Sequence, residues 1–305
     1  MSLPSLHMLL NTGIPVVVCA RPWARDLLAG YELAGFIEME GNWQEDRAAV
    51  SSFRKKSHHA HVRGLILPDS LSSAMVFKFA GVPSAGFRDE GRSLILKWPV
   101  KKPPAFFHAV EVWHHLTAET LRRWGLPAIP ARPGPELALL ISSRHRAEAA
   151  RAVEAAGLSA HRFLLIAPTA TGLHRGKVKV WPHFDALTRR LQDQGYTVVV
   201  CPPGSELHSA KKNAPTALCL PPLKLGAFAT LTQLASLVIC NDSGVSHLAA
   251  AAGARQVTLF GVTDPERTGP WSANALCLGS ADTWPSLEEV EGTILNVCST
   301  AALSA

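Results

Sequence analysis

The chain has 305 residues, a formal net charge of +6 and an isoelectric point near 9.1. Hydrophobic residues make up 47% of it and charged residues 18%, a balance that supports packed cores and excludes wholesale disorder. The length is sufficient for two domains of ordinary size. The positive charge favours an anionic partner such as a nucleotide, a phosphorylated glycan, a nucleic acid or an acidic membrane face, and does not select among them.

The six cysteines are widely spaced and form no CxxC pair. Structural zinc is therefore not expected. The cysteine pattern predicts a reducing, cytoplasmic setting. No apolar run approaches the ~20 residues that are needed to cross a bilayer. The N-terminus lacks the charged-then-apolar pattern of a secretion signal. These features predict a soluble protein.

Strand-like and helix-like segments alternate along the chain. Short, β-branched apolar runs predict strands at residues 14–20, 63–68, 162–168, 196–202, 235–240 and 255–261. Apolar residues at helical spacing predict helices at residues 144–158, 183–195, 245–252 and 286–301. Strand, helix and strand in series is typical of an α/β protein whose parallel sheets are buried on both faces.

A domain boundary is expected near residue 158. A proline-rich passage at residues 127–136 is followed by the predicted helix 144–158, and a new strand–loop–helix unit begins after it. We therefore predict two Rossmann-like domains, residues 1–158 and 159–305, with a cleft between them. Ligands of such folds bind outside the carboxyl ends of the strands.

Three loops at predicted strand ends in the second half carry glycine together with hydroxyl, basic or acidic side chains. They are "TATGLHRGKVKVWP" (residues 169–182), "PGSELH" (203–208) and "NDSGVSH" (241–247). Such side chains suit a nucleotide diphosphate, because hydroxyls and backbone N–H groups bind its oxygens, a lysine neutralises charge and a carboxylate binds a sugar hydroxyl.

The last of these loops opens an alanine-rich helix, and a helix N-terminus offers unpaired N–H groups and a positive dipole end to an anion. The alternative interpretation is that Asp242 or Ser243 only caps this helix.

Three stretches resemble a known family. "NDSGVSHLAAAAGARQVTLFGVTDPERTGPW" (residues 241–271) is similar to the pattern D-[ST]-G-x-x-H-[LI]-A-A, a strand, and then [FY]-G-x-[TS]-x-P of glycosyltransferase family 9, and "KVWP" (179–182) matches its K-x-W-P. Residues 67–96 also resemble the stretch of its heptosyltransferases that follows the sheet core of the first domain. The likeness extends over nearly the whole chain.

The resemblance implies the GT-B architecture, in which two Rossmann-like domains with parallel sheets face each other across a cleft. The first domain then holds the acceptor and the second the nucleotide sugar. The implied reaction is the inverting transfer of heptose from ADP-heptose to the Kdo or heptose of the lipopolysaccharide inner core. A helix dipole and a lysine can stabilise the departing diphosphate, so neither an obligatory metal nor a cofactor is expected.

The resemblance also assigns roles to residues. Lys179 and Asp242 are the expected catalytic residues: Lys179 neutralises the ADP phosphates and Asp242 contacts the donor. Glu206 is expected at the ribose or adenine. The other expected donor-binding residues line the phosphate pocket or lie at the start of the helix, and they are Thr169, Thr171, Gly172, Ser243, Gly244 and His247.

Several residues have plainer interpretations. Asp264, which precedes Pro265, is expected to cap a helix rather than act as an acid. Lys177 is expected to be solvated, and His247 has the alternative of packing within its helix. The run "RKKSHHAH" (residues 54–61) predicts a basic, solvated helix face rather than a metal site, because no carboxylate or cysteine is interleaved.

The beginning of the chain departs from the family pattern. Relatives begin with a strand and a Gly-Asp turn whose aspartate is the general base, whereas "MSLPSLHMLLNTG" already matches the helix that follows it. Two explanations are open: the true start lies upstream, or the chain is a catalytically silent, nucleotide-sugar-binding relative. A different sugar donor is a further alternative.

The basic balance also predicts peripheral contact with the inner membrane, where the phosphorylated lipid acceptor lies. Nucleic-acid binding is not expected, because basic residues are dispersed and aromatic residues make up only 7%.

Overall fold

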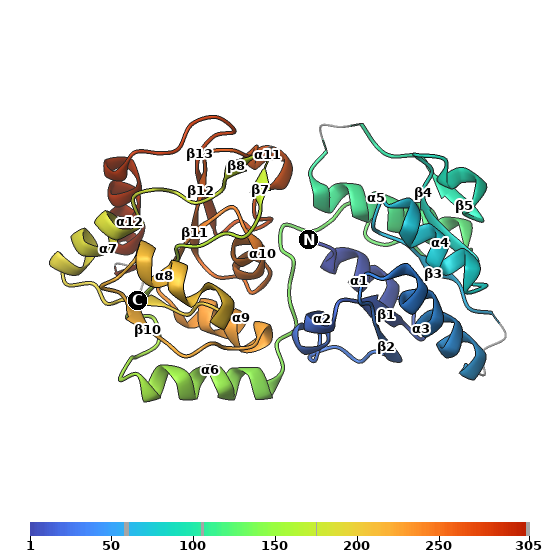
Figure 1. The fold of residues 1–305 in the computed structure, drawn as a ribbon, viewed down its shortest axis with the longest axis horizontal. Helices are drawn as coiled ribbons and strands as arrows, with labels where there is room; N and C mark the ends of the chain where they lie inside the picture. The colour runs from blue at the N-terminus through green and yellow to red at the C-terminus, as the bar shows by residue number, and fades with distance from the viewer. Residues whose placement is uncertain (58–60, 105–106, 175, 303–305) are drawn as a thin grey trace. The chain divides into compact units, whose positions relative to one another are not determined.

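The computed structural model describes residues 1–57, 61–104, 107–174 and 176–302, and it divides the chain into two compact units, residues 1–134 and 135–305 (Figure 1). The division lies earlier than the predicted residue 158. The reason is that helix α6 (Ser143–Ala155) packs against α9 (Leu225–Leu234) of the second unit. A Cβ atom built on Gly226 in α9 would lie 2.1 Å from the His145 ring, so the two helices approach closely at this glycine.

The first unit contains two separate parallel sheets. One pairs β1 (Val17–Ala20) with β2 (Gly35–Glu38), and the other has the order β3 (Gly64–Leu65), β4 (Ser84–Phe87), β5 (Trp98–Val100). The strands predicted at residues 14–20 and 63–68 are confirmed as β1 and β3. Each of these two strands has one partner strand among the described residues, and no ladder joins β1 to β3 there.

Helices surround these two sheets. They are α1 (Leu3–Leu10), α2 (Pro22–Leu27), α3 (Trp43–Lys56), α4 (Leu71–Phe79) and α5 (Ala109–Arg123), with a short 3-10 helix η1 (Arg92–Leu94) before β5. The apolar residues of the unit pack in several small clusters rather than in one, and these clusters lie between α3, α4 and the first sheet, between α1 and α5, and against the second sheet.

The second unit is built on one six-stranded parallel sheet of order β10-β9-β6-β11-β12-β13. Its strands are β6 (Leu164–Ala167), β9 (Val198–Val200), β10 (Leu218–Cys219), β11 (Leu237–Asn241), β12 (Gln256–Phe260) and β13 (Ala275–Gly279). Numbered along the chain this order is 3-2-1-4-5-6, that of a dinucleotide-binding Rossmann sheet, in which the direction of winding reverses beside the first strand. The four predicted strands of this half are confirmed.

Helices cover both faces of this sheet (Figure 1). Helices α7 (Phe184–Asp193) and α12 (Leu287–Ala302) pack on one side, and α6, α9 and α10 (Gly244–Ala251) on the other. The predicted apolar face of α7 enters the core, where Phe184, Leu187 and Leu191 are buried against Val290 and Ile294 of α12. Removal of such side chains from water is the main stabilisation of the unit.

The remaining elements of the second unit are short. A hairpin of β7 (Leu173–His174) and β8 (Lys177–Val178) precedes α7, and η2 (Gly204–Glu206), α8 (Leu207–Asn213) and α11 (Pro265–Thr268) lie in loops at strand ends.

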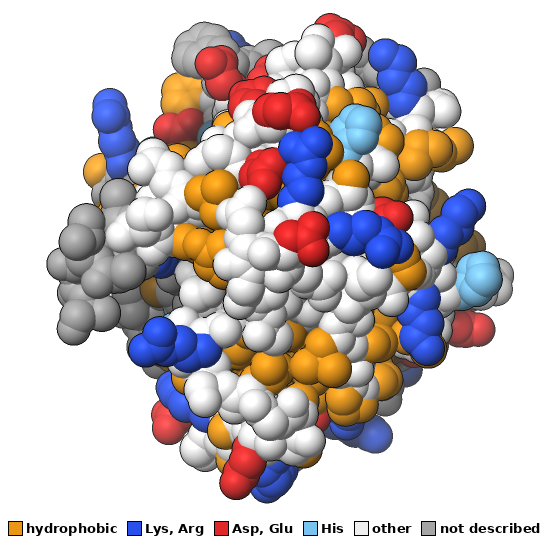
Figure 2. All heavy atoms as spheres, turned by 90° about the vertical axis from the view of Figure 1, so that its left-hand side faces the viewer, with side chains coloured by type: hydrophobic (Ala, Val, Ile, Leu, Met, Phe, Trp, Pro, Cys, Tyr) orange, Lys and Arg blue, Asp and Glu red, His pale blue; other side chains and the backbone are white. Residues whose placement is uncertain are grey.

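The surface charge is mixed where it can be seen. On the face in Figure 2, acidic and basic side chains are interspersed rather than separated into single-sign patches. Within the described residues, no helix combines the length and the apolar character that a bilayer span requires. All six cysteines are unpaired.

Candidate active site

The three predicted loops meet at one edge of the second unit's sheet. Strand β6 lies between β9 and β11, and all three run parallel, so their carboxyl ends point the same way. Cys240 of β11 lies beside Ala167 of β6, which places the loop after Asn241 next to the loop that begins at Thr169. Since the winding of the sheet reverses here, this is where a Rossmann-like sheet leaves room for a ligand.

Asp242 and Lys179 form an ion pair at the end of β11. Lys179 Nζ lies 3.1 Å from Asp242 Oδ2, and the side chains are 21% and 6% exposed. The Thr263 hydroxyl donates a hydrogen bond of 2.6 Å to the same carboxylate oxygen, and His247 Nε2 lies 4.0 Å from Oδ1. The carboxylate therefore holds three groups from separate segments, one of them a lysine ammonium that remains partly open to solvent.

Helix α10 begins beside this ion pair. Its N-cap is Ser243, whose hydroxyl accepts a hydrogen bond of 3.3 Å from Val245 N, while the Ser246 hydroxyl donates to the Ser243 carbonyl at 2.8 Å. The capping interpretation thus holds for Ser243, whereas the Asp242 carboxylate is bound to Lys179 and Thr263. Gly244 occupies the first helical position, and a Cβ atom there would have no neighbour within 4 Å.

Asn241 links the loops to one another. It is fully buried, and its side-chain oxygen accepts a hydrogen bond of 2.9 Å from Trp181 N. Its amide nitrogen donates to the carbonyls of Ala167 and Thr169, both at 3.4 Å. Trp181 is itself anchored, because its indole N–H donates to the Pro285 carbonyl at 2.9 Å. One amide side chain therefore positions the segment that carries Lys179 relative to the loop after β6.

A second contact joins the loops after β6 and β9. The Thr169 hydroxyl donates a hydrogen bond to the Glu206 carboxylate, and Asn213 Nδ2 donates to the Pro168 carbonyl at 2.7 Å. Thr169 and Glu206 are thus adjacent, as are Lys179, Asp242 and His247.

Thr171 and Gly172 are exposed at the start of the β7–β8 hairpin. Among the described residues, neither of them forms a hydrogen bond to Lys179, Asp242 or His247. Gly172 has a φ of +82°, a conformation that favours glycine.

Asp264 and Lys177 behave as their plainer interpretations predicted. Asp264 is the N-cap of α11, and its carboxylate accepts a hydrogen bond of 3.0 Å from Glu266 N. The side chain of Lys177 is 62% exposed and lies 3.9 Å from Asp282, which is also exposed.

The basic run at residues 54–61 is described only in part. Its first three residues are the exposed end of α3, and residues 58–60 lie outside the described part of the chain. Elsewhere in the described residues, no group of three or more His, Cys, Asp or Glu side chains is arranged to hold a metal ion.

Two residues of the site were not identified from the sequence. Asn241 precedes Asp242 as the last residue of a buried strand, and a polar side chain at a fully buried position signals a hydrogen-bonding role. Thr263 belongs to the quoted "FGVTDP" stretch, but only the fold brings it to Asp242.

The arrangement can bind a group with concentrated negative charge. A partly exposed ammonium, the N–H groups at the start of α10 and the hydroxyl of Thr169 all lie at the carboxyl edge of the sheet. Helix N-termini and lysine side chains both favour phosphate oxygens.

Comparisons with known proteins point to one family. A family model described as glycosyltransferase family 9 (heptosyltransferase) matches residues 52–297. The chain is 28% identical to lipopolysaccharide heptosyltransferase 2 of Escherichia coli (strain K12), over 89% of this chain and 82% of that protein.

Solved structures agree. The structure of E. coli ADP-heptose LPS heptosyltransferase II is 25% identical with a TM-score of 0.75, covering 98% of this chain and 95% of that one. The E. coli heptosyltransferase WaaC with ADP is 20% identical with a TM-score of 0.74, covering 97% and 95%. The predicted GT-B fold class is thereby confirmed.

Proposed function

The chain belongs to glycosyltransferase family 9, and we propose that it transfers heptose from ADP-heptose to the inner core of lipopolysaccharide with inversion at the anomeric carbon. The observation that carries the proposal is the Lys179–Asp242 ion pair at the entrance to α10. The solved structures of E. coli ADP-heptose LPS heptosyltransferase II and of heptosyltransferase WaaC with ADP support an adenine nucleotide as the leaving group.

In the proposed reaction the acceptor hydroxyl attacks the anomeric carbon on the face opposite the diphosphate. The bond from the acceptor oxygen to this carbon forms as the bond from the carbon to the phosphate oxygen breaks, and ADP leaves with the bonding electron pair. The hydroxyl proton passes to a base. The sugar ring acquires oxocarbenium-like positive charge while negative charge grows on the diphosphate.

The residues of the second unit act on that growing charge. Lys179 lies against the diphosphate and neutralises it, and the start of α10 at Gly244 contributes the positive end of the helix dipole. Asp242 orients Lys179 and contacts the donor, and Thr263 holds its carboxylate in place. Glu206, whose carboxylate accepts a hydrogen bond from the Thr169 hydroxyl, contacts the ribose or adenine of the donor in this proposal.

The acceptor is a phosphorylated glycolipid, so we also propose peripheral contact with the inner membrane face. The net charge of +6 supports this contact, because anionic lipids attract basic protein surfaces.

The test is a donor screen that separates binding from turnover. ADP-heptose and UDP-N-acetylglucosamine are each titrated into the protein by calorimetry, and nucleotide release is followed with and without a heptose-deficient lipopolysaccharide acceptor. The proposal is supported if ADP is released from ADP-heptose only when the acceptor is present, and if UDP-N-acetylglucosamine releases no nucleotide. Binding of ADP-heptose without release of ADP supports the alternative of nucleotide-sugar binding without turnover, and selective binding of the uridine nucleotide refutes the assignment of the donor.

A further inference from the structure

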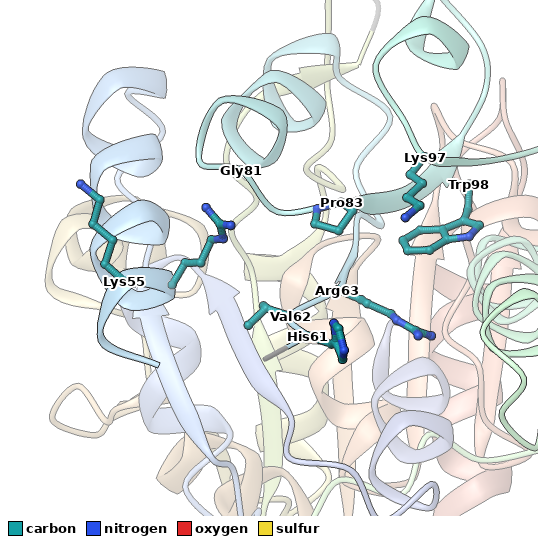
Figure 3. Close-up of a pocket in the computed structure, with 9 residues that line it drawn as sticks. Lys55, His61, Val62, Arg63, Gly81, Pro83, Lys97 and Trp98 are labelled. Atoms are coloured by element: carbon teal, nitrogen blue, oxygen red, sulfur yellow. The ribbon is translucent and has the colours of Figure 1, made fainter. Parts of the chain in front are cut away.

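A basic cavity of about 530 Å³ lies in the first unit, and Arg54, Lys55 and His61 of the basic run at residues 54–61 belong to its lining. Val62 and Arg63 directly precede β3, Pro83 precedes β4, and Trp98 begins β5 (Figure 3). The three strands are parallel, so the cavity lies at their amino-terminal edge. The ligands of Rossmann-like sheets bind at the opposite, carboxyl-terminal edge, and the cavity is therefore a separate feature of this unit.

The charged residues that line the cavity are all basic. Among the residues that the structure describes, Arg54, Lys55, Arg63 and Lys97 line it together with His61, and no aspartate or glutamate does. Some cations of the unit are paired with carboxylates, as in Arg25–Glu38, Arg92–Asp69 and Lys102–Asp69. Among the described residues, none of the four cavity cations has such an ion pair. Their positive charge is therefore available to an anion.

Two of these cations are positioned by tryptophan rings. Arg63 Cζ lies 5.8 Å from the ring centroid of Trp98 and 5.8 Å from that of Trp124, and Arg63 Nη1 donates to the Trp124 carbonyl at 3.3 Å. Lys97 Nζ lies 5.1 Å from the Trp98 centroid. Figure 3 shows Lys97 and Trp98 together at one side of the cavity. Cations held in this way lose less freedom when a ligand binds.

The other side of the cavity carries Arg54. Its Nη1 atom would lie 2.5 Å from a Cβ atom built on Gly81, so the guanidinium lies against the backbone of this glycine. Figure 3 shows Gly81 and Pro83 between Lys55 and Lys97, with the ammonium group of Lys55 directed away from the cavity. Arg54 and Lys97 thus flank the cavity from elements far apart in the sequence.

A plainer origin exists for part of this charge. Arg54 and Lys55 lie in the last turn of α3, where cations stabilise the helix dipole. That effect does not account for Arg63, which lies in a loop, or for Lys97, which lies before β5.

We propose that the cavity binds a phosphate group, either in the headgroup of an anionic phospholipid or as soluble phosphate. The proposal does not depend on the donor site of the second unit.

The test compares two variants with equal loss of charge. Arg54→Gln/Lys97→Gln removes cations on opposite sides of the cavity, and Arg47→Gln/Lys78→Gln removes two exposed cations of the same unit that do not line it. Binding is measured to vesicles of phosphatidylcholine with phosphatidylglycerol, to pure phosphatidylcholine vesicles, and by calorimetry to inorganic phosphate and pyrophosphate. All four residues are exposed, and circular dichroism verifies that both variants fold.

Cavity-dependent binding is the expected result. The cavity variant should bind its anion about 30-fold more weakly, because each cation near an anionic lipid surface contributes about 1 kcal/mol. The matched variant should stay within about 3-fold of the unaltered protein. If the cavity variant loses binding to the vesicles that contain phosphatidylglycerol, the site binds a lipid headgroup. If it loses binding to inorganic phosphate or pyrophosphate, the site binds a soluble phosphate. Equal weakening by both variants, or no binding of any of these anions, overturns the proposal.

Discussion

Replacing Lys179 by methionine removes the ammonium group beside Asp242 and keeps most of the apolar volume of the side chain. Two unit charges 4 Å apart interact by ~4 kcal/mol at an effective dielectric constant of 20. Lys179 is 21% exposed, so solvent reduces this value, and the range of about 1.5–3 kcal/mol for a hydrogen bond to a charged group is the better guide. The affinity for ADP should therefore fall about 10- to 100-fold.

The same variant should also lose stability. It leaves the carboxylate of Asp242, which is only 6% exposed, without its cation, and breaking one partner of a buried pair costs about 3–5 kcal/mol. The partial exposure of Lys179 lowers this cost. The double variant Lys179→Met/Asp242→Asn removes both charges, so its free energy of unfolding should recover toward that of the unaltered protein, while its affinity for ADP stays low.

The assay is calorimetric titration of both variants with ADP and with adenosine, accompanied by urea unfolding. Adenosine carries no phosphate, and its affinity should not change in the double variant. An equal loss of affinity for ADP and adenosine would show that Lys179 acts through the fold rather than on the phosphates. An unchanged affinity for ADP in both variants would refute the placement of the diphosphate at α10.

Three further predictions concern separate features. Gly244→Ala places a methyl group in open space at the start of α10, so the free energy of unfolding should stay within about 0.5 kcal/mol of that of the unaltered protein. If a phosphate of ADP lies against this glycine, the affinity for ADP should fall. An unchanged affinity for ADP would contradict the placement of the phosphate at Gly244. Asn241→Ala leaves the buried Trp181 N–H unpaired, and urea unfolding should show a loss of about 1–3 kcal/mol, whereas an unchanged midpoint would show that water replaces the amide. Burial lowers the pKa of His114 from 6.5, so its contribution to stability is intact above pH 6.5 and is lost as the pH falls through the lower folded-state pKa. The free energy of unfolding, measured at pH 7.5 and 5.5, should therefore depend less on pH in His114→Asn than in His115→Asn.

The second unit was the more predictable half of the fold. Its strands β6, β9, β11 and β12 and its helices α6, α7, α10 and α12 lie within the segments predicted from the sequence or extend beyond them by one residue. Long, fully buried parallel strands have uniformly apolar sequences, as in "RFLLIAP", and amphipathic helices have a clear period. The edge strand β13 was not predicted, because "ALCLG" contains no β-branched residue and several of its residues are exposed.

The first unit was harder to predict. Strands β2, β4 and β5 were not identified, and β5 contains the proline of "WPV", which weakens a strand signal. The boundary between the units also differed from residue 158, since a helix after a proline-rich passage does not reveal which unit it packs on. Burial by α9 decides that α6 belongs to the second unit.

By itself, the sequence determined which segments form the sheet of the second unit and which loops follow its strands, because apolar periodicity and glycine-rich turns are local properties of the chain. The family resemblance added the residues of the donor site, Lys179 and Asp242 among them. Only the tertiary structure decided that β6 lies between β9 and β11, that Thr263 and Lys179 meet on one carboxylate, and that Asn241 holds the loops together. These contacts join residues from 21 to 74 positions apart, and packing of the whole sheet, rather than any local pattern, brings such residues within hydrogen-bonding distance.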